Sequence, residues 1–146
     1  MDDIKGLIEI TTSLLEYKKT DWEKTSFLIY LSELYLKEHN LIKAWDILNI
    51  IDSYLKKFDG WEETGLGRSV MDVALDTCMN LKDNRKLALE IFNWIDKKFE
   101  QMKNISVSLF EKAIIAAKLL ELNDREDYYQ KIYDTEHQKI LKMMGK

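Results

Sequence analysis

The sequence predicts an all-α fold: about seven helices, arranged as a leading helix and three stacked antiparallel helical hairpins, in a single domain over residues 1–146. The chain contains no proline and only five glycines, so it lacks most of the residues that interrupt helices. Apolar residues recur at helical spacing in seven successive windows. Short polar turns join the last six windows in pairs, and helices joined by short turns run antiparallel.

The leading helix is expected at about residues 3–18, and the first hairpin at about residues 21–58. The apolar stripe of the leading helix is Ile4, Leu7, Ile8, Thr11, Leu14 and Leu15. The hairpin opens with Thr20-Asp-Trp-Glu23, whose spacing is that of a capping box, in which Thr and Glu satisfy exposed amides at a helix start. Asn40 is expected to cap its second helix. The apolar residues of the two helices are Phe27, Leu28, Leu31, Leu34 and Tyr35, then Leu41, Ala44, Trp45, Leu48, Ile51, Leu55 and Phe58.

The second hairpin is expected at about residues 60–100. Asp59-Gly-Trp-Glu62 again has capping-box spacing, which predicts a helix that begins near Gly60 or Trp61. Gly65 and Gly67 then lie inside this helix, or at a break just before residues 66–70. Asp83-Asn84 offers the turn and the cap of the next helix. The two apolar stripes are Leu66, Val70, Val73, Ala74, Cys78 and Leu81, then Leu87, Ala88, Ile91, Phe92, Ile95 and Phe99.

The third hairpin is expected at about residues 105–144. Ser108-Leu-Phe-Glu111 is a further capping box, at the start of a sixth helix or within its first turn. That helix has so little polar surface that we expect it to be the most buried. Asn123-Asp-Arg-Glu126 then starts a seventh helix. The apolar residues of the two helices are Phe110, Ala113, Ile114, Ile115, Ala116, Ala117, Leu119 and Leu120, then Tyr129, Ile132, Tyr133, Ile140, Leu141 and Met144.

The three hairpins form an internal repeat when they are aligned on their turns. Leu31 and Tyr35 correspond to Leu75 and Met79, then to Ile115 and Leu119; Ala44 and Leu48 correspond to Ala88 and Phe92, then to Tyr128 and Ile132. In this pattern the chain resembles tetratricopeptide or pentatricopeptide repeats over residues 21 to about 143. The resemblance implies an α-solenoid in which each hairpin stacks on the next. The third unit, with Tyr128 in place of a small residue, is expected to be an atypical capping unit.

The resemblance also implies a function: a non-catalytic adaptor that binds a helix or an apolar peptide of a partner protein. In such repeats the first helices of the hairpins line one shared surface. The expected outward positions are Ile29, Glu33, Lys37, Val73, Thr77, Asn80, Phe110, Ala113 and Ala117.

Two alternatives remain open. One is RNA binding in the manner of pentatricopeptide repeats, although the net charge of −4 is spread evenly and no basic block is present, which argues against nucleic acid. The other is a small-ligand or anion site at the Gly65–Arg68 joint, where helix-start amides and an arginine meet. That joint lacks the third glycine, the Lys-Ser or Lys-Thr pair and the preceding strand of known phosphate loops, so a structural role for the glycines is favoured.

No catalytic, metal-binding or cofactor-binding residues are expected. His39 and His137 have no visible acid–base partner, and neither belongs to a Glu-x-x-His pair of the kind that binds metals in helical bundles. Cys78, the single cysteine, lies on an apolar stripe and is expected to be a buried thiol.

Aromatic residues indicate surfaces for partners. Two or more exposed residues would mark a binding surface among the tryptophans Trp22, Trp45, Trp61 and Trp94 and the cluster Tyr128, Tyr129 and Tyr133, although Trp45 is expected in the core. We expect Tyr129, Tyr133 and Met144 on the last helix to mediate homodimerisation or docking on a partner. The acidic N-terminus is unlike a secretory signal, and no apolar run is long enough to cross a membrane, which predicts a cytoplasmic protein.

Overall fold

The computed structural model describes residues 2–18, 20–57, 64–102 and 105–145. These residues form seven α-helices and no strand, as predicted. The helices are α1 (Asp2–Leu15), α2 (Asp21–Lys37), α3 (Leu41–Leu55), α4 (Gly65–Asn80), α5 (Arg85–Gln101), α6 (Val107–Leu119) and α7 (Asn123–Met143).

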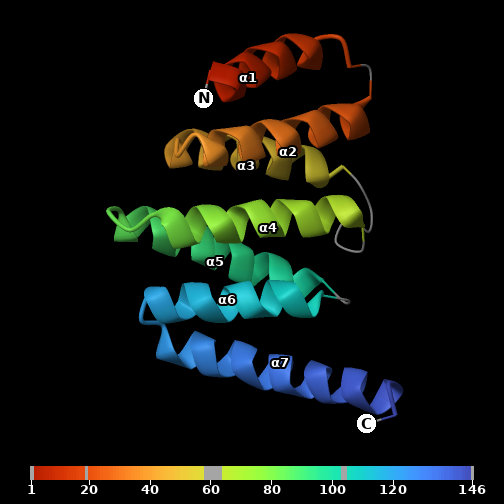
Figure 1. Cartoon of the computed structure of the whole chain (residues 1–146), viewed down its shortest axis with the longest axis vertical. Helices are drawn as coiled ribbons and strands as arrows, with labels where there is room; N and C mark the ends of the chain where they lie inside the picture. The colour runs from red at the N-terminus through yellow and green to blue at the C-terminus, as the bar shows by residue number, and fades with distance from the viewer. Residues whose placement is uncertain (1, 19, 58–63, 103–104, 146) are drawn as a thin grey trace.

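The helices lie in a row along the long axis of the molecule, with the two ends of the chain at opposite ends of the row (Figure 1). α2 packs on α3, α4 on α5, and α6 on α7, so the three predicted hairpins are present. The first helices of the hairpins also contact one another, because α4 packs against both α2 and α6. α1 packs on α2 at one end of the row.

Side-chain caps fix most of the helix starts. The Thr20 hydroxyl accepts a hydrogen bond from the Glu23 amide at 3.1 Å and donates one to the Glu23 carboxylate at 3.0 Å. Asn40 and Asn84 cap α3 and α5, as predicted. Ser106 caps α6, which places Ser108 within the first turn of that helix rather than before it.

The glycine-containing joint forms the first turn of α4. Thr64 accepts a hydrogen bond from the Gly67 amide at 3.2 Å, so the helix begins at Gly65, which agrees with the predicted break before residues 66–70. The capping box expected at residues 59–62, and with it a helix start near residue 60, lies outside the described residues.

The first and third hairpins turn in the same way. His39 and Glu121 have positive φ angles of 62° and 58°, and the turns close with hydrogen bonds from the Asn40 amide to the Tyr35 carbonyl and from the Leu122 amide to the Ala117 carbonyl, both 2.9 Å. Tyr35 is therefore equivalent to Ala117.

The predicted alignment of the third hairpin was therefore wrong by two residues. It matched Tyr35 with Leu119 because residues 123–124 were taken as the turn, whereas they begin α7. The predicted core positions Ile115 and Leu119 are consequently 50% and 58% exposed, while Ala113 and Ala117 are fully buried.

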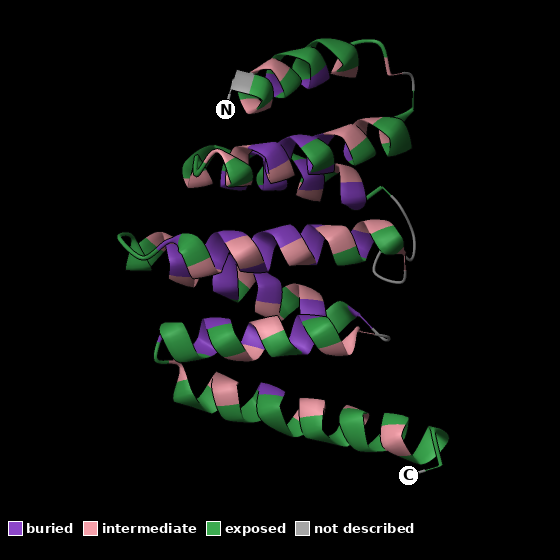
Figure 2. Ribbon diagram, viewed as in Figure 1, coloured by how far each residue is buried: buried purple, intermediate pink, exposed green. Residues whose placement is uncertain are grey.

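The core is densest in the middle of the row, in α3, α4 and α5 (Figure 2). α4 buries more of its residues than α6 does, so the expectation that α6 would be the most buried helix is wrong. The reason is position, since α4 lies between α2 and α6 and also contacts α3 and α5. α7 has a single buried residue, Tyr129.

Ion pairs connect each hairpin to the next one in the row. Lys98 of α5 lies 2.7 Å from Asp52 of α3, and both side chains are less than a fifth exposed. Asp96 of α5 binds Arg125 of α7 at 2.5 Å. Among the first helices, Lys112 of α6 binds two aspartates of α4. Neighbouring units are thus held together by charge as well as by apolar packing.

Candidate functional site

A groove of about 750 Å³ lies between α5, α6 and α7, and we call it the α5–α7 groove. The C-terminal part of α7 extends past the start of α6, so this part of the helix is not covered by it (Figure 1). The groove is lined by the C-terminal end of α5, the N-terminal end of α6 and one side of α7, including Met102 after α5, Ile105 before α6 and Ile132 of α7. Its size is within the range of pockets that bind small molecules or side chains of a peptide.

Aromatic rings from three helices form the floor of the groove. Phe99 of α5 and Tyr129 of α7 are 5.7 Å apart and nearly perpendicular, and Phe110 of α6 lies 6.0 Å and 6.2 Å from them. Phe92 packs against Tyr129 from the core side at 6.3 Å. Phe99, Phe110 and Tyr129 therefore each contact the other two rings in edge-on or tilted geometry, which stabilises the floor.

A polar network fixes Tyr129 in this floor. The Asp96 carboxylate accepts hydrogen bonds from the Tyr129 hydroxyl and from the Arg125 guanidinium, the latter at 2.5 Å. Burial, and then the neighbouring Asp96, raise the pKa of Tyr129, so the phenol remains a hydrogen-bond donor. The Arg125 guanidinium also stacks 4.3 Å from the ring of Tyr128, and this contact fixes the orientation of the guanidinium.

Charged side chains of both signs form the rim. Glu136 and Lys139 of α7 bind each other at 3.2 Å. Arg68 of α4 and Glu100 of α5 also line the groove, and neither has an ion pair with any of the described residues. The partly exposed apolar walls, Ile105 and Ile132, beside charges that have no ion pair with the described residues suit a bound segment that offers apolar anchors and polar flanks.

Most of the binding residues predicted on the first helices are buried, so the expectation that they face outward is wrong for them. These residues are Ile29, Val73, Thr77, Phe110, Ala113 and Ala117. They lie on the sides of α2, α4 and α6 that pack into the core or against a neighbouring helix. Glu33 is half-buried, and Lys37 and Asn80 are exposed, as expected. Phe110 is the single member of the predicted set that lines the α5–α7 groove.

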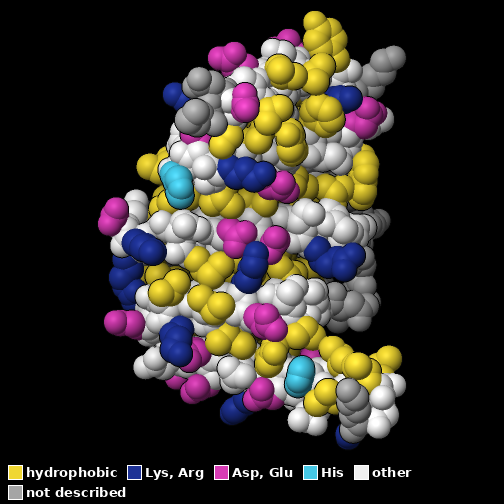
Figure 3. Space-filling model, viewed as in Figure 1, with side chains coloured by type: hydrophobic (Ala, Val, Ile, Leu, Met, Phe, Trp, Pro, Cys, Tyr) yellow, Lys and Arg dark blue, Asp and Glu magenta, His cyan; other side chains and the backbone are white. Residues whose placement is uncertain are grey.

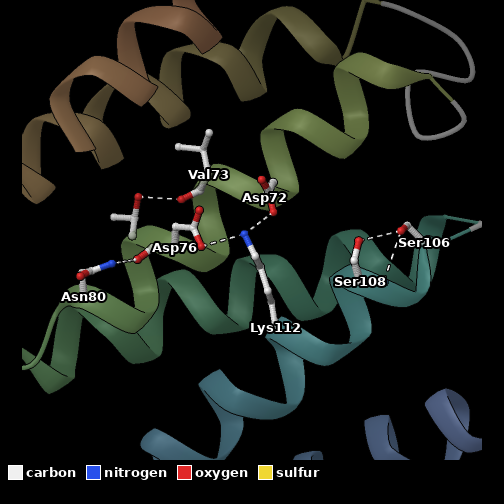
Figure 4. A network of polar contacts seen from close by, with 8 residues as sticks. Asp72, Val73, Asp76, Asn80, Ser106, Ser108 and Lys112 are labelled. Carbon is white, nitrogen blue, oxygen red and sulfur yellow. Dashed lines mark hydrogen bonds and ion pairs between the residues drawn. The ribbon is translucent and has the colours of Figure 1, made fainter. Parts of the chain in front are cut away.

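The outward face of α4 is formed by Asp72 and Asp76, one residue before the predicted positions. The Lys112 ammonium lies between them, 2.5 Å from Asp72 and 2.9 Å from Asp76 (Figure 4). Burial lowers the pKa of Lys112, but its hydrogen bonds to the two aspartates outweigh that effect and raise it. Acidic and basic side chains therefore alternate over the middle of this face (Figure 3).

Glu33 of α2 adds a carboxylate to the same face. The pKa of Glu33 is raised overall. Burial raises it most, the charge of Asp72 adds to this, and the charge of Lys37 opposes it. Sequence reasoning missed this charged face because spacing alone did not distinguish the outward side of α4 from its neighbour-facing side. Asp72 and Asp76, four residues apart on a helix that is otherwise apolar, were the available signal.

The partner surface predicted on α7 is only partly exposed. Tyr129 is 1% exposed and cannot contact a partner, so this assignment is wrong. Tyr133 is half-buried and donates a hydrogen bond to Glu111 at 3.2 Å. Met144 is 62% exposed. Tyr129 is buried because α7 turns this side toward α5 and α6.

The predicted tryptophans also divide between the core and the surface. Trp45 is buried, as predicted, and packs edge-on against the half-buried Trp94 at 5.8 Å. Trp22 is 44% exposed. Trp61 lies outside the described residues.

The residues considered for catalysis are dispersed. His39 is exposed in the turn between α2 and α3. His137 is exposed on α7, with its ring stacked 5.7 Å from the ring of Tyr133. The Cys78 thiol is buried 3.3 Å from the Ala88 carbonyl, and burial raises its pKa to about 12. Within the described part of the chain, no three His, Cys, Asp or Glu residues are grouped so that they could hold a metal ion.

No family model matches the chain, and neither a curated protein nor a solved structure matches it. Among the described helices, none combines the length and the apolar character needed to cross a bilayer. The α5–α7 groove and the charged face of α2, α4 and α6 are therefore the features from which function can be inferred.

Proposed function

We propose that the protein is a non-catalytic interaction module that binds a helix or an apolar peptide of a partner protein in the α5–α7 groove. The observation that supports this best is the groove of about 750 Å³, which is lined by the partly exposed apolar side chains of Ile105, Tyr128 and Ile132. The buried rings of Phe99, Phe110 and Tyr129 support it from below. A groove with such walls accepts one or two large apolar side chains, which is how helices and peptides anchor in helical grooves.

The chemistry of the groove favours binding over catalysis. Acid–base catalysis needs a group that can gain and lose a proton near the operating pH. The carboxylate of Asp96 is held by Arg125 and Tyr129, and Glu136 is bound to Lys139. The pKa of Tyr129 is raised, which keeps its proton in place. These groups position the floor and the rim rather than supply a reactive centre.

The rim favours a partner segment with charges on both sides of its apolar anchors. Arg68 can pair with a carboxylate of the partner, and Glu100 with a cation. The tetratricopeptide resemblance would be consistent with this role. RNA remains disfavoured because the groove has acidic as well as basic residues on its rim and the chain is acidic overall.

A small anionic ligand is the second candidate, because Arg68 in the first turn of α4 lines the groove and has no ion pair with the described residues. A thermal scan with inorganic phosphate and a panel of nucleotides separates the two candidates. Stabilisation by a nucleotide that is lost in Arg68→Ala would support the ligand, and no stabilised member of the panel would argue against it.

A peptide selection tests the main proposal. We expect helical peptides selected on the wild-type protein to bind Ile50→Lys, which alters an exposed residue of α3, and to lose at least about tenfold in affinity for Ile132→Lys, which alters the groove wall. Circular dichroism would establish that both variants remain folded. Selected peptides that bind Ile132→Lys as tightly as the wild type would exclude the groove as the binding site.

A further inference from the structure

α1 has two apolar faces, of which one is unpartnered. Ile8 and Thr11 are buried against α2. On the other side, an apolar stripe runs along the helix and into the turn that follows it; we call it the α1 stripe, and its members are Leu7, Ile10, Leu14 and Tyr17. They are 40%, 57%, 44% and 77% exposed. Hydrophobic side chains are correspondingly prominent over α1 and α2 in the space-filling view (Figure 3).

The spacing of the α1 stripe fits a second helix. Its three helical members, Leu7, Ile10 and Leu14, are separated by three and four residues, which is the spacing of the seam between two paired helices. Tyr17 lies in the turn that follows α1. Leu7 and Leu14 were expected on the same face as Ile8 and Thr11, but the structure separates them because α2 covers only part of the helix circumference.

We propose that the α1 stripe is covered by the α1 stripe of a second copy of the chain, in an antiparallel arrangement about a two-fold axis. With the axis near residue 12, Ile10 faces Leu14 of the other copy, and Leu7 lies toward the turn that carries Tyr17. Each contact therefore pairs two apolar side chains.

The charges along α1 favour this arrangement. Asp3 lies at the N-terminal end of the stripe and Lys18 just beyond its C-terminal end. Antiparallel pairing places Lys18 of each copy within about one helical turn of Asp3 of the other, whereas parallel pairing places like charges side by side. The Lys18 ammonium lies 4.3 Å from the ring of Phe27 of α2 in its own chain, so it leaves this ring when it pairs with Asp3 of the other copy.

Gly6 leaves room for a close partner. Glycine destabilises a helix interior relative to alanine. A Cβ at Gly6 would meet no atom within 4 Å in this chain, so packing inside the chain does not require glycine there. In the two-fold pair, Gly6 faces Lys18 of the other copy, and the absence of a side chain lets the aliphatic part of that lysine cross the helix toward Asp3.

The two ends of the row differ, which favours pairing of like ends. The outer side of α7 is polar along most of its length, with the exposed residues Asp124, Asp127, Lys131, Asp134 and Gln138. Its exposed apolar residues are Tyr128 near its start, whose ring stacks on Arg125, and Ile140, Met143 and Met144 at the C-terminal tip. A head-to-tail contact would set the α1 stripe against this polar side, whereas a two-fold contact sets the stripe against itself and closes the assembly.

The area predicts a weak dimer. The four side chains expose on the order of 400 Å² in each copy, whereas a stable interface buries roughly 600–1,000 Å² per partner. Polar residues beside the stripe add to this area. We therefore expect a dissociation constant on the order of 10–100 µM.

Sedimentation equilibrium between about 10 and 500 µM tests the proposal. We expect a monomer–dimer equilibrium that Ile10→Glu weakens at least about tenfold. The matched control is Ile50→Glu on α3, where the wild-type residue is 45% exposed, and it should leave the equilibrium unchanged. A chain that is monomeric at 500 µM, or a dimer insensitive to Ile10→Glu, overturns the pairing through α1.

Charge reversal tests the antiparallel arrangement. Asp3→Lys or Lys18→Asp alone should weaken the dimer about two- to fivefold, because each places like charges together. The double variant should recover most of the wild-type affinity. A double variant no tighter than either single variant would overturn the arrangement even if Ile10→Glu abolishes the dimer.

Discussion

Replacing Tyr129 by phenylalanine removes one hydroxyl from the floor of the α5–α7 groove, and we expect it to lower the free energy of unfolding by about 1–2 kcal/mol at pH 7. The ring contacts with Phe99 and Phe110 remain. The lost hydrogen bond has a charged acceptor, Asp96, and Tyr129 is 1% exposed. Hydrogen bonds to charged groups contribute about 1.5–3 kcal/mol, and the lower value applies because Asp96 keeps its ion pair with Arg125.

The pH dependence of this difference follows from the direction of the pKa shift. Burial and the neighbouring Asp96 raise the pKa of Tyr129 in the folded protein above its ordinary value of 10.0. Such a group stabilises the fold fully below its unfolded pKa and loses that contribution as the pH rises toward the folded pKa. The difference between wild type and Tyr129→Phe should therefore be constant from about pH 6 to 9 and decrease above about pH 10.

Urea unfolding followed by circular dichroism at 222 nm measures both effects. Tyr133→Phe is the matched control, because its hydroxyl binds the exposed Glu111 at the surface of α6, and we expect no measurable change. A Tyr129→Phe variant within about 0.3 kcal/mol of wild type at pH 7, or a difference that grows above pH 10, would refute the assigned role of the hydroxyl.

Three further predictions concern the contacts between hairpins and the cysteine. Asp52→Ala should cost about 2–3 kcal/mol in urea unfolding, because it removes the carboxylate beside Lys98, which is 13% exposed; a cost below about 0.5 kcal/mol would contradict this. Lys112→Ala should lower the free energy of unfolding by only about 0.5–1 kcal/mol, since solvent screens its ion pairs. This loss should shrink in 1 M salt, and also as the pH rises above 10.5, because the pKa of Lys112 is raised in the folded protein. A loss that is independent of salt and pH would argue against these pairs. Cys78 should react with a thiol reagent at pH 8 only through unfolding, because burial raises its pKa to about 12, and rapid labelling of the native protein would exclude that environment.

Local signals in the sequence were sufficient to predict the helices. The caps at Thr20, Asn40 and Asn84 involve contacts over three residues, so they depend little on the rest of the fold. The turn of the third hairpin was misplaced because it depends on a left-handed Glu121, a residue type that does not usually adopt this conformation, while Asn123 and Asp124 resemble turn residues.

The functional surfaces could not be predicted in the same way, since they depend on which side of each helix meets a neighbour. Phe99 and Tyr129 were recognised as apolar stripe residues, but their contact brings together α5 and α7, which are separated by a whole helix. On α4, a rotation of one residue distinguishes the buried Val73 from the partly exposed Asp72. Helical periodicity defines a stripe to within about this margin.

The position of α1 at the end of the row affects how this helix unfolds. α1 has packing on one side, from α2, and in the described structure no ion pair holds it to the rest of the chain. Its amide protons should therefore exchange with solvent earlier than those of α4, through local opening of the terminal helix. Slower exchange in α1 at higher protein concentration, with α4 unchanged, would indicate that self-association protects the least stable helix of the fold.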